Sequence, residues 1–453
     1  MESVNQFELT KEFLERFGEA IESHDILFIQ ASLSGVNSAD ISALLHEFDS
    51  KDSKYVLELL DVETGSEIIK GLDPDTRLEF LSEFETNEIS KYVNELDSDD
   101  AADIVNELPI KIREAVIDGL DNEEKASNVL ELLRYDEDCA GGLMAKELIK
   151  ANANWTIGKT IDEIRRQAED VQKVYAVYVV DDGDKLLGRV SLKRIVLADD
   201  HMKVSSIYDQ EVVAVETYME EVEVASVMRK YDLEAVPVIN MQGKLVGRIT
   251  IDDIVDVITD LAEQERQLMA GISEDVEEDD SVWVLTRARL PWLVIGMIGG
   301  LLGALFMETF EKNITLTLTF FIPLIMATGG NVGIQSSSLV VQGLANKSAF
   351  SQTTYRRLGK VFWVAILNGV LLAIMVFLGV QFVMGNGFRL ALIVSLALLS
   401  VVLLASFMGT ATPLILDKFG INPALASGPF ITTANDLLGL AVYFGVAHIL
   451  YTL

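Results

Sequence analysis

Five apolar runs, each long enough to cross the roughly 30 Å of hydrocarbon in a bilayer, dominate the C-terminal part of the chain. They lie near residues 290–310, 314–342, 357–384, 388–416 and 425–451. In lipid, such a run is stable only when its backbone hydrogen bonds are satisfied internally, as they are in a helix. The sequence therefore predicts a multi-domain protein whose residues 287–453 form a transmembrane domain of five helices.

Acidic side chains are concentrated ahead of the first apolar run. Residues 1–281 hold 66 of the 70 Asp and Glu residues but only 27 of the 36 Lys and Arg residues. A chain with a formal net charge of −34 repels the phosphates of nucleic acids, so we expect no nucleic-acid partner and favour cationic ones. Cys139 is the single cysteine, which excludes an internal disulfide framework and a cysteine-built zinc site.

The basic residues between the spans predict the orientation in the membrane. Cytosolic loops carry an excess of Lys and Arg, and five spans place alternate loops on opposite sides. Seven basic residues share a side with the N-terminus: Arg287, Arg289, Lys347, Arg356, Arg357, Lys360 and Lys418. Only Lys312 and Arg389 lie on the other side. The start of the chain does not resemble a signal peptide. We expect a multi-pass protein of the inner (plasma) membrane, with a cytosolic N-terminus and an external C-terminus.

A 12-residue repeat runs through the first part of the chain. A Leu-like residue recurs at Leu60, Leu72, Phe84, Leu96, Leu108, Leu120 and Leu132. Asp73 followed by Pro74 is typical of a helix N-cap with proline in the first helical position, so each unit is predicted to be one short helix and a tight turn. Units of this kind bury their apolar faces on their neighbours. We therefore predict an α-helical, superhelical N-domain over residues 1–145.

A second, longer repeat follows. Residues 177–196 align without gaps on residues 236–255, and each copy is predicted to form two strands ending in Gly-Arg, then a helix started by Ser or Thr. This pattern resembles a tandem CBS pair, an α+β arrangement that commonly senses adenine nucleotides or ions, over residues 146–258. In nucleotide-binding members an aspartate after the Ser or Thr holds the ribose. The resemblance therefore implies Thr250 and Asp253 as nucleotide-binding residues and ATP as a candidate cofactor, whereas the first copy has Arg194 after Ser191.

The segment between the CBS pair and the first span is strongly acidic. We predict a connecting, plug-like helix and an acidic linker over residues 259–286, with the run DVEEDD at 275–280 as hydrated linker.

Asp436 is the one acid placed inside an apolar run. An ionised carboxylate at membrane depth costs at least about 2.5 kcal/mol, so such a residue is a functional candidate by default. On a helix, Gly428, Thr432, Asp436 and Gly439 share one face. This stripe could line an ion path. A structural aspartate bonded to a neighbouring helix is the alternative.

The second run contributes further polar groups at membrane depth. Glycines and a proline in PLIMATGGNVGIQSSSLVVQGLA are expected to weaken the helix, and Asn331, Gln335 and Ser336 offer amides and hydroxyls to an ion path. In the first run, two GxxxG pairs, Gly296/Gly300 and Gly299/Gly303, favour close helix packing.

The second and fifth runs, with PLIMATGGNVGIQSSSLVVQGLA and NPALASGPFITTANDLLGL, look like the two signature segments of the MgtE family of magnesium channels. The resemblance extends through DSDDAADIVNELP, YDEDCAGGLM and the CBS pair. It implies a homodimer, a pore on the two-fold axis, and a cytosolic gate that closes when internal Mg²⁺ is high. The pore aspartate of the family falls on Asp436. Gly428 stands where the family often has Asn, and Thr432 where it has a small apolar residue.

The same resemblance implies regulatory metal ligands in the soluble part. They are Glu67, Asp99, Asp103, Asp232, Asp253 and Asp256. Acidic surfaces repel one another at low Mg²⁺, and bound divalent ions can bridge them and favour a compact, closed state. A plain surface charge is the alternative for each of these acids.

We therefore predict a Mg²⁺-selective channel for magnesium uptake, embedded in the lipid bilayer and closed by Mg²⁺ bound to its acidic cytosolic domains. An ion-coupled divalent-cation transporter or exporter is one alternative. A membrane-anchored CBS nucleotide sensor is another. We do not expect an enzyme, because no nucleophile and base pair or HExxH motif accompanies Asp436.

Overall fold

A computed structural model of the chain describes residues 9–168, 171, 173–273, 276, 280–310, 316–345, 354–383, 387–426 and 428–452. The chain divides into two compact units, Met1–Ile258 and Thr259–Leu453. Four of the six residues of the DVEEDD run lie outside the described residues, so the acidic linker stays a prediction.

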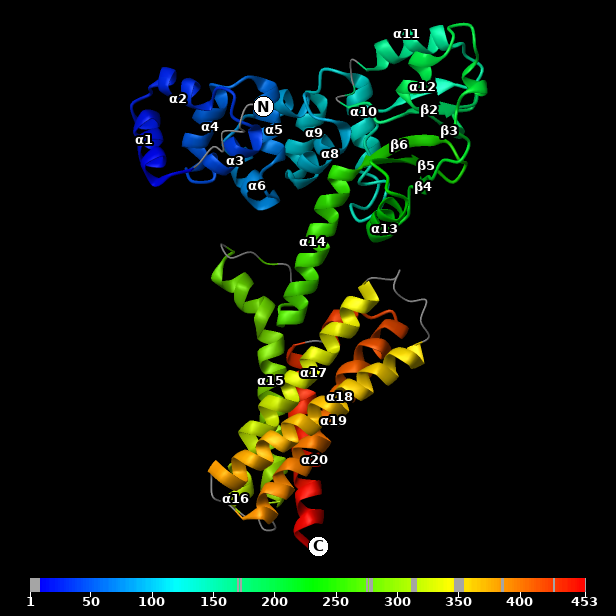
Figure 1. Ribbon diagram of the computed structural model, residues 1–453. Helices are drawn as coiled ribbons and strands as arrows, with labels where there is room; N and C mark the ends of the chain where they lie inside the picture. Colours follow the sequence, from blue (N-terminus) through cyan, green and yellow to red (C-terminus); the bar gives the residue numbers. More distant parts are fainter. Residues whose placement is uncertain are drawn as a thin grey trace. The chain divides into compact units, whose positions relative to one another are not determined.

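Ten short helices form the described part of the chain before the first strand (Figure 1). They are α1 (Lys11–Glu22), α2 (Ile26–Leu33), α3 (Ser38–Leu45), α4 (Ser50–Glu58), α5 (Val62–Lys70), α6 (Pro74–Leu81), α7 (Thr86–Val93), α8 (Ser98–Glu107), α9 (Ile110–Asp118) and α10 (Glu123–Leu132). From α4 onward there is one helix for each 12-residue repeat, which confirms the prediction of one helix and one turn per unit.

In most repeats the acidic position caps a helix, and the apolar position packs between neighbouring helices. Asp61 and Asp73 are N-caps whose carboxylates accept hydrogen bonds from the amides of Thr64 and Thr76, and Pro74 occupies the first turn of α6 as predicted. The recurring apolar residue falls at the end of a helix or in the turn after it, as Leu72 does after α5, and is buried in most repeats. Each such leucine stabilises the stack by about 1.5 to 3 kcal/mol.

Two three-stranded sheets follow, one for each CBS copy. The first contains β1 (Ile149–Asn152), β2 (Val177–Val180) and β3 (Leu186–Val190), with helices α11 (Ile157–Gln167) and α12 (Leu192–Leu197). The second contains β4 (Val215–Glu216), β5 (Ala235–Ile239) and β6 (Leu245–Thr250), with helices α13 (Glu221–Tyr231) and α14 (Ile251–Ala270). In each sheet the first two strands are parallel and the last two antiparallel.

The two sheets share the same register, which confirms the internal repeat. Tyr178 pairs with Arg189 in the first sheet, and Pro237 pairs with Arg248 in the second. A bulge follows Val179 in one sheet and Val238 in the other. Because bulges set local twist, the two copies bend at equivalent points.

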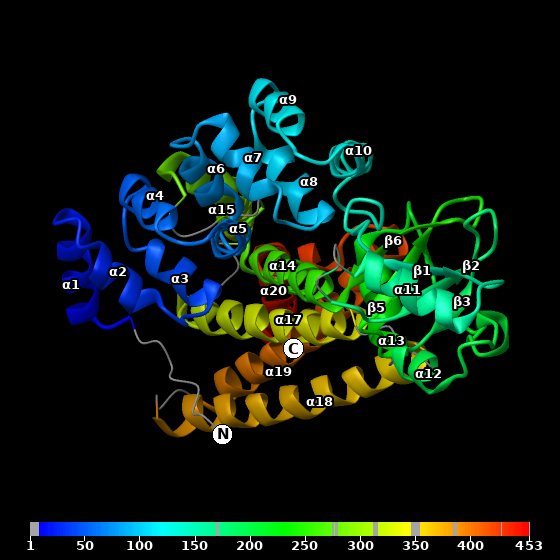
Figure 2. The same ribbon diagram turned by 90° about the horizontal axis from the view of Figure 1, so that it is seen from above.

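The second unit contains five helices that are long and apolar enough to span a membrane, counted over its described residues. Its helices are α15 (Val282–Phe310), the short α16 (Leu316–Thr319), α17 (Ile322–Ala345), α18 (Thr354–Leu378), α19 (Phe388–Lys418) and α20 (Pro429–Thr452). Helix α19 packs against α17, α18 and α20, and it is the most buried of the five spans. Helices α17, α19 and α18 lie side by side in both ribbon views (Figures 1 and 2).

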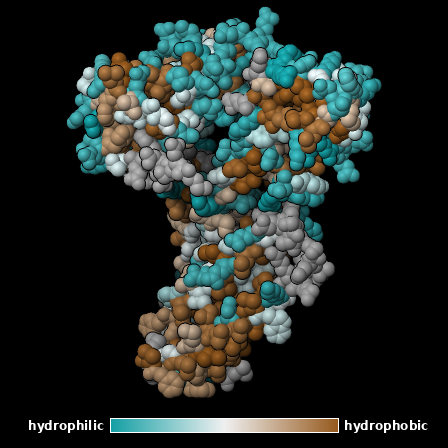
Figure 3. All heavy atoms as spheres, turned by 45° about the horizontal axis from the view of Figure 1, so that its top comes forward, coloured by the Kyte–Doolittle hydropathy of each residue, from teal (hydrophilic) through white to brown (hydrophobic). Residues whose placement is uncertain are grey.

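Apolar side chains cover the outside of this bundle. Figure 3 shows hydrophobic residues gathered over the transmembrane helices and hydrophilic residues over much of the first unit, Met1–Ile258. We call this first unit the soluble unit. Leu293, Leu301 and Leu305 of α15 and Trp363 and Met375 of α18 are all exposed. An exposed apolar surface of this extent is typical of a chain whose solvent is lipid.

The glycines of α15 divide into two groups. A β-carbon built on Gly299 would lie 2.1 Å from Cγ2 of Thr433 in α20, and one on Gly303 would lie 3.6 Å from Cδ1 of Leu440. For Gly296 and Gly300, no such contact occurs within 4 Å in the described part of the chain. The predicted close packing is therefore confirmed for Gly299 and Gly303 only.

Candidate ion pathway and acidic cluster

Asp436 lies in α20 and is half-buried. Thr432, one turn earlier on the same face, approaches α17: its Cγ2 lies 3.5 Å from a β-carbon built on Gly330. Among the described residues Asp436 makes no hydrogen bond or ion pair, so the structure supplies no neighbouring helix partner for the structural alternative. A half-buried carboxylate at membrane depth without such a partner is suited to a mobile cation.

The glycines of the second apolar run do not interrupt the helix that contains them. Helix α17 continues from Ile322 to Ala345. Its glycines permit close helix contacts instead: a β-carbon on Gly333 would lie 1.9 Å from Nδ2 of Asn435, and one on Gly329 would lie 3.1 Å from Val401. Since the hydrogen bonds of the helix stay intact, this close packing can offset the roughly 1 kcal/mol that each glycine costs in a helix.

The polar residues of α17 do not all face α20. Asn331 and Gln335 are exposed, and among the described residues no hydrogen bond joins Asn331 to Asp436. Ser336 contacts Ser406 of α19, with 3.2 Å between the two hydroxyl oxygens. The geometry therefore brings Thr432 into the α17–α20 contact and leaves Asn331 on the exposed side of its helix.

Asn435 is a polar residue that sequence reasoning missed. It is 3% exposed, and neither atom of its side-chain amide has a hydrogen-bond partner in the described structure. Its place beside Asp436, inside the same apolar run, was the available signal. It packs on Gly333, where a larger residue would not fit.

The end of α14 meets the start of α20 backbone against backbone. Gly428 has a φ of +58°, and Gly271 has a φ of +85°. A β-carbon on Gly271 would lie 2.4 Å from Cγ of Pro429. A β-carbon on Gly428, which was predicted on the stripe of Asp436, would lie against the carbonyl oxygen of Met269, so Gly428 also contacts the connecting helix.

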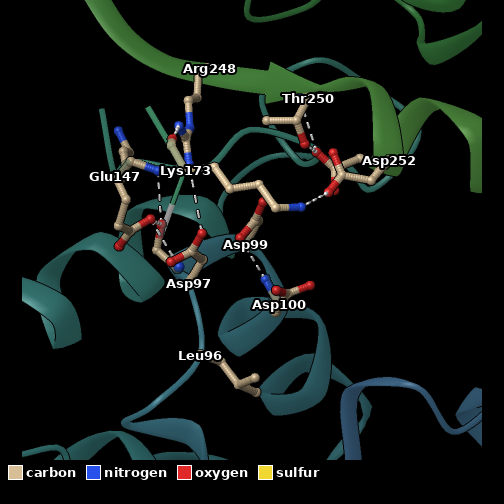
Figure 4. Close-up of polar contacts among 12 residues, drawn as sticks. Leu96, Asp97, Asp99, Asp100, Glu147, Lys173, Arg248, Thr250 and Asp252 are labelled. Atoms are coloured by element: carbon tan, nitrogen blue, oxygen red, sulfur yellow. Dashed lines mark hydrogen bonds and ion pairs between the residues drawn. The ribbon is translucent and has the colours of Figure 1, made fainter. Parts of the chain in front are cut away.

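An acidic cluster forms in the soluble unit, where the first turns of α8 and α14 come together (Figure 4). Asp97, Asp99 and Asp100 come from α8 and its N-cap, and Asp252 and Asp253 from α14. Helix N-termini favour negative charge, which explains why acids stand at both starts. We call these five residues the α8–α14 cluster.

Four of the five carboxylates of the cluster have raised pKa values, those of Asp97, Asp99, Asp100 and Asp253, whereas the pKa of Asp252 is lowered. Burial, Asp100 and Asp253 hold the pKa of Asp99 well above its usual value, and Asp99 is only 9% exposed. Burial also raises the pKa of Asp253, against hydrogen bonds from Thr250 that lower it. For Asp97, burial and Glu147 raise the pKa to about 6. Negative charge is therefore held here at a cost that a bound cation would reduce.

Three basic residues already enter this cluster. Nζ of Lys70 lies 2.7 Å from Oδ2 of Asp100, and Nζ of Lys173 lies 3.8 Å from Oδ2 of Asp252. Nη2 of Arg248 lies 3.8 Å from Oδ2 of Asp97. Within the described residues, no group of three or more His, Cys, Asp or Glu side chains is arranged to hold a metal ion. The carboxylates of the cluster thus repel one another, and three basic side chains neutralise part of their charge.

Two other predicted regulatory acids, Glu67 and Asp103, lie near the cluster. Glu67 is half-buried and contributes to the high pKa of Lys70, which burial alone would lower. Burial of its carboxylate, together with the charges of Asp100 and Glu137, raises the pKa of Asp103 to about 7. Because the residue as a whole is exposed, solvent screens part of this effect.

Asp232 and Asp256 are exposed. Asp232 ends α13 in a left-handed conformation, with a φ of +52°. The structure therefore brings Asp99 and Asp253 together, and it does not place Asp232 or Asp256 with them.

Thr250 and Asp253, the two residues predicted to bind a nucleotide, are hydrogen-bonded to each other. The amide and hydroxyl of Thr250 donate to Oδ2 of Asp253 at 3.0 and 2.7 Å. In the first copy the Oγ of Ser191 accepts a hydrogen bond from the amide of Arg194 at 3.3 Å and caps α12. A ribose would have to compete with Thr250 for the carboxylate of Asp253.

Comparisons with known proteins cover the whole architecture. A family model described as a divalent cation transporter matches residues 322–446, one described as the MgtE intracellular N domain matches residues 36–138, and CBS models match residues 140–201 and 204–260. The chain is 33% identical to the magnesium transporter MgtE of Enterococcus faecalis over 330 residues, 72% of each chain. The chain belongs to the MgtE family. The MgtE magnesium transporter of Thermus thermophilus is 34% identical over 324 residues, 70% of this chain and 71% of that one.

Solved structures agree with this membership of the MgtE family. One is the cytosolic domain of the Mg²⁺ channel MgtE in complex with ATP, with 32% identity and a TM-score of 0.50 over 53% of this chain and 98% of that one. Another is the soluble part of a magnesium transporter, with 26% identity and a TM-score of 0.50 over 56% of this chain and 99% of that one. The predicted MgtE resemblance is therefore confirmed. So is the multi-domain class of helical N-domain, tandem CBS pair, connecting helix and membrane helices.

Proposed function

We propose that this MgtE family member is a Mg²⁺-selective channel that mediates magnesium uptake and is closed by Mg²⁺ bound to its acidic soluble unit. The observation that carries the proposal is Asp436, a half-buried carboxylate in a membrane helix without an ion-pair or hydrogen-bond partner in the described chain. The magnesium transporters and the Mg²⁺ channel that this chain is similar to support the choice of ion.

We propose a homodimer with the pore on its two-fold axis. Two copies of Asp436 would then form a −2 site, with Thr432 beside it and Asn331 available from α17. Mg²⁺ gives up water reluctantly and prefers octahedral oxygen, so a site with few carboxylates and several retained waters suits it. Exposed apolar residues on α12 and at the start of α14 offer a surface for the second copy: Leu192, Val196, Leu197, Ile251, Val255 and Ile258.

The gate is proposed to respond to charge in the soluble unit. Asp99 and Asp253 are the central residues, since burial raises the pKa of both and the carboxylate of Asp253 raises that of Asp99 further. Glu67, Asp103, Asp232 and Asp256 are proposed as further ligands. Divalent ions that bridge these acids would stabilise the compact, closed state, and mass action makes closure depend on Mg²⁺ concentration.

Nucleotide binding and orientation complete the proposal. Thr250 and Asp253 are proposed to contact ATP, by analogy with the ATP complex of the similar cytosolic domain. The soluble unit is proposed to lie in the cytosol and the C-terminus outside, on the distribution of basic loops.

The test is Mg²⁺ uptake and current in the Asp436→Ala variant. Loss of both, with the dimer intact, is the expected result, because the ion loses the carboxylate that the proposal places in its path. Asp417→Asn, an exposed acid at the end of α19, is the control and should conduct normally. Unchanged uptake in Asp436→Ala would show that the pore assignment is wrong. Transport that requires a coupling ion, with no current down the gradient, would favour the ion-coupled transporter or exporter.

A further inference from the structure

Asn435 carries a buried amide that the fold leaves without a partner. The residue is 3% exposed, and neither its Oδ1 nor its Nδ2 has a hydrogen-bond partner among the described residues. It lies in α20, near the middle of the candidate span Pro423–Leu450. Buried side-chain amides are nearly always hydrogen-bonded, and lipid offers no water to replace a missing partner. This arrangement of the helices therefore carries a cost at Asn435 that an arrangement with a partner for the amide would not carry.

Other buried polar side chains of the membrane helices differ from Asn435 in this respect. The hydroxyl of Ser337 donates to the carbonyl oxygen of Ala426 at 3.2 Å, and the hydroxyl of Thr410 donates to that of Ser406 at 2.7 Å. Among the described residues, Asn435 is the one side chain whose donor and acceptor are both buried and unpaired. The lack of a partner is therefore a feature of this position in α20.

Helix α17, against which Asn435 packs, is also held by α19. A β-carbon on Gly333 would lie 1.9 Å from Nδ2 of Asn435, whereas one on Gly409 of α19 would lie 2.4 Å from the carbonyl oxygen of Gly333. The hydroxyl oxygens of Ser336 and Ser406 lie 3.2 Å apart across the same contact between α17 and α19. Because α17 is held against α19 in this way, we expect any separation at Asn435 to come from a movement of α20.

The start of α20 is where such a movement would begin. A β-carbon on Gly428 would lie 2.1 Å from the carbonyl oxygen of Met269, so the end of α14 touches the backbone that leads into α20. Asn435 and Asp436 are neighbours in α20, and Thr432, one turn before Asp436, packs on α17. Separation of α20 from α17 would therefore open a gap that Thr432 and Asn435 both face, directly beside Asp436.

We propose that Asn435 is a residue of the ion pathway that is exposed only in the conducting state. In the arrangement described here its amide is sealed between α17 and α20. In the conducting state α20 separates from α17, and the amide meets the water shell that Mg²⁺ retains beside Asp436. Since hydration restores the hydrogen bonds of the amide, the sealed arrangement favours opening. This role of Asn435 rests on the proposed function, because it requires a pathway that Mg²⁺ closes.

Thiol labelling of the full-length protein in lipid vesicles tests this directly. The single cysteine is first replaced by Cys139→Ser, which keeps a donor to the carbonyl oxygen of Asp136. Asn435→Cys is then treated with hydroxyethyl methanethiosulfonate, a neutral, water-soluble reagent that does not compete with Mg²⁺ for Asp436. Labelling, measured as the mass shift of the intact protein, should be about tenfold faster or more in EDTA than in saturating Mg²⁺.

Two further cysteine variants in the same background calibrate the labelling. Ser406→Cys lies buried where α19 meets α17 and should react slowly in both solutions. Asp417→Cys lies exposed at the end of α19 and should react rapidly in both. A difference between EDTA and Mg²⁺ at Asn435→Cys then reports on that position and not on the reagent.

A second variant measures what the unpaired amide does to closure. Asn435→Leu keeps a side chain of similar size and removes the amide, so it should favour the sealed arrangement. The Mg²⁺ concentration for half-closure, measured from currents, should fall about tenfold. Thr410→Val removes a buried hydroxyl that has a partner, and it should leave that concentration nearly unchanged.

Two results would overturn the proposal in a protein whose currents Mg²⁺ closes. One is equal labelling of Asn435→Cys in EDTA and in Mg²⁺. The other is a half-closure concentration that Asn435→Leu raises or leaves unchanged, as expected if the amide only stabilises the closed packing. An unaltered protein that Mg²⁺ fails to close is a different observation: it would refute the proposed function itself, and with it the closed state in which Asn435 is sealed.

Discussion

Gly428 and the carbonyl oxygen of Met269 leave no room for a side chain between them, since a β-carbon on Gly428 would lie 2.1 Å from that oxygen. The connecting helix α14 thus ends directly against the backbone that begins α20, eight residues before Asp436. The proposed closure of the channel would act through this contact, whose fit one added methyl group would spoil.

Gly428→Ala should weaken closure of the channel by Mg²⁺. The added methyl group must push α14 away from α20, and overpacking of this kind typically costs about 1 to 3 kcal/mol. We expect the Mg²⁺ concentration for half-closure, measured by single-channel recording, to rise about tenfold.

Gly420→Ala is the matched control. Gly420 also has a positive φ, +71°, but in the described structure nothing lies within 4 Å of a β-carbon placed there. It shares the backbone strain of the first variant and lacks its clash. Equal effects in the two variants would show that strain, and not contact with Met269, matters.

Neutralising four proposed regulatory acids should leave the channel open at high internal Mg²⁺. The variant changes Asp99, Asp103, Asp253 and Asp256 to Asn, which removes the charges that divalent ions would bridge. Mg²⁺-titrated currents measure the result. Four exposed aspartates provide a charge-matched control: Asp40, Asp118, Asp121 and Asp200. Normal closure in the first variant would remove the bridging hypothesis.

Without divalent ions, the soluble unit should be more stable at pH 5.5 than at pH 7.5. The pKa of Asp97 is raised to about 6 in the folded state from a usual value of 3.8, so the folded state binds more protons between these values. Its contribution to stability is full below the unfolded pKa and is lost as the pH rises through about 6. Thermal unfolding of the full-length protein in EDTA should show the difference, and Asp97→Asn should reduce it. A melting temperature that rises with pH over this range would contradict the assignment.

Gly333→Ala should destabilise the membrane bundle. The new methyl group would overlap the Asn435 side chain between α17 and α20, at a cost of about 1 to 3 kcal/mol. Heating the purified protein and measuring how much of it still elutes as a single peak in size-exclusion chromatography checks this. Gly300→Ala, where the described structure leaves open space, should be tolerated. Equal losses in both variants would argue against the close packing of Gly333 on Asn435.

Local patterns predicted most of the architecture. The 12-residue period specifies helices α4 to α10, because most units carry a capping side chain and a buried apolar residue. The CBS copies could be aligned because strand, turn and helix signals recur together. The glycines that were expected to weaken α17 leave it continuous, since a helix tolerates glycine when a neighbouring helix packs closely on it.

The sequence by itself determined the membrane helices, the acidic soluble part and Asp436 as the intramembrane charge, because hydrophobicity and charge are properties of single residues and short runs. Only the tertiary structure decided which residues meet. It paired Asp99 with Asp253, buried Arg248 while leaving Arg189 exposed, and set Gly428 against Met269. These relationships join segments far apart in the chain, and their energies depend on burial and distance, which no local pattern records.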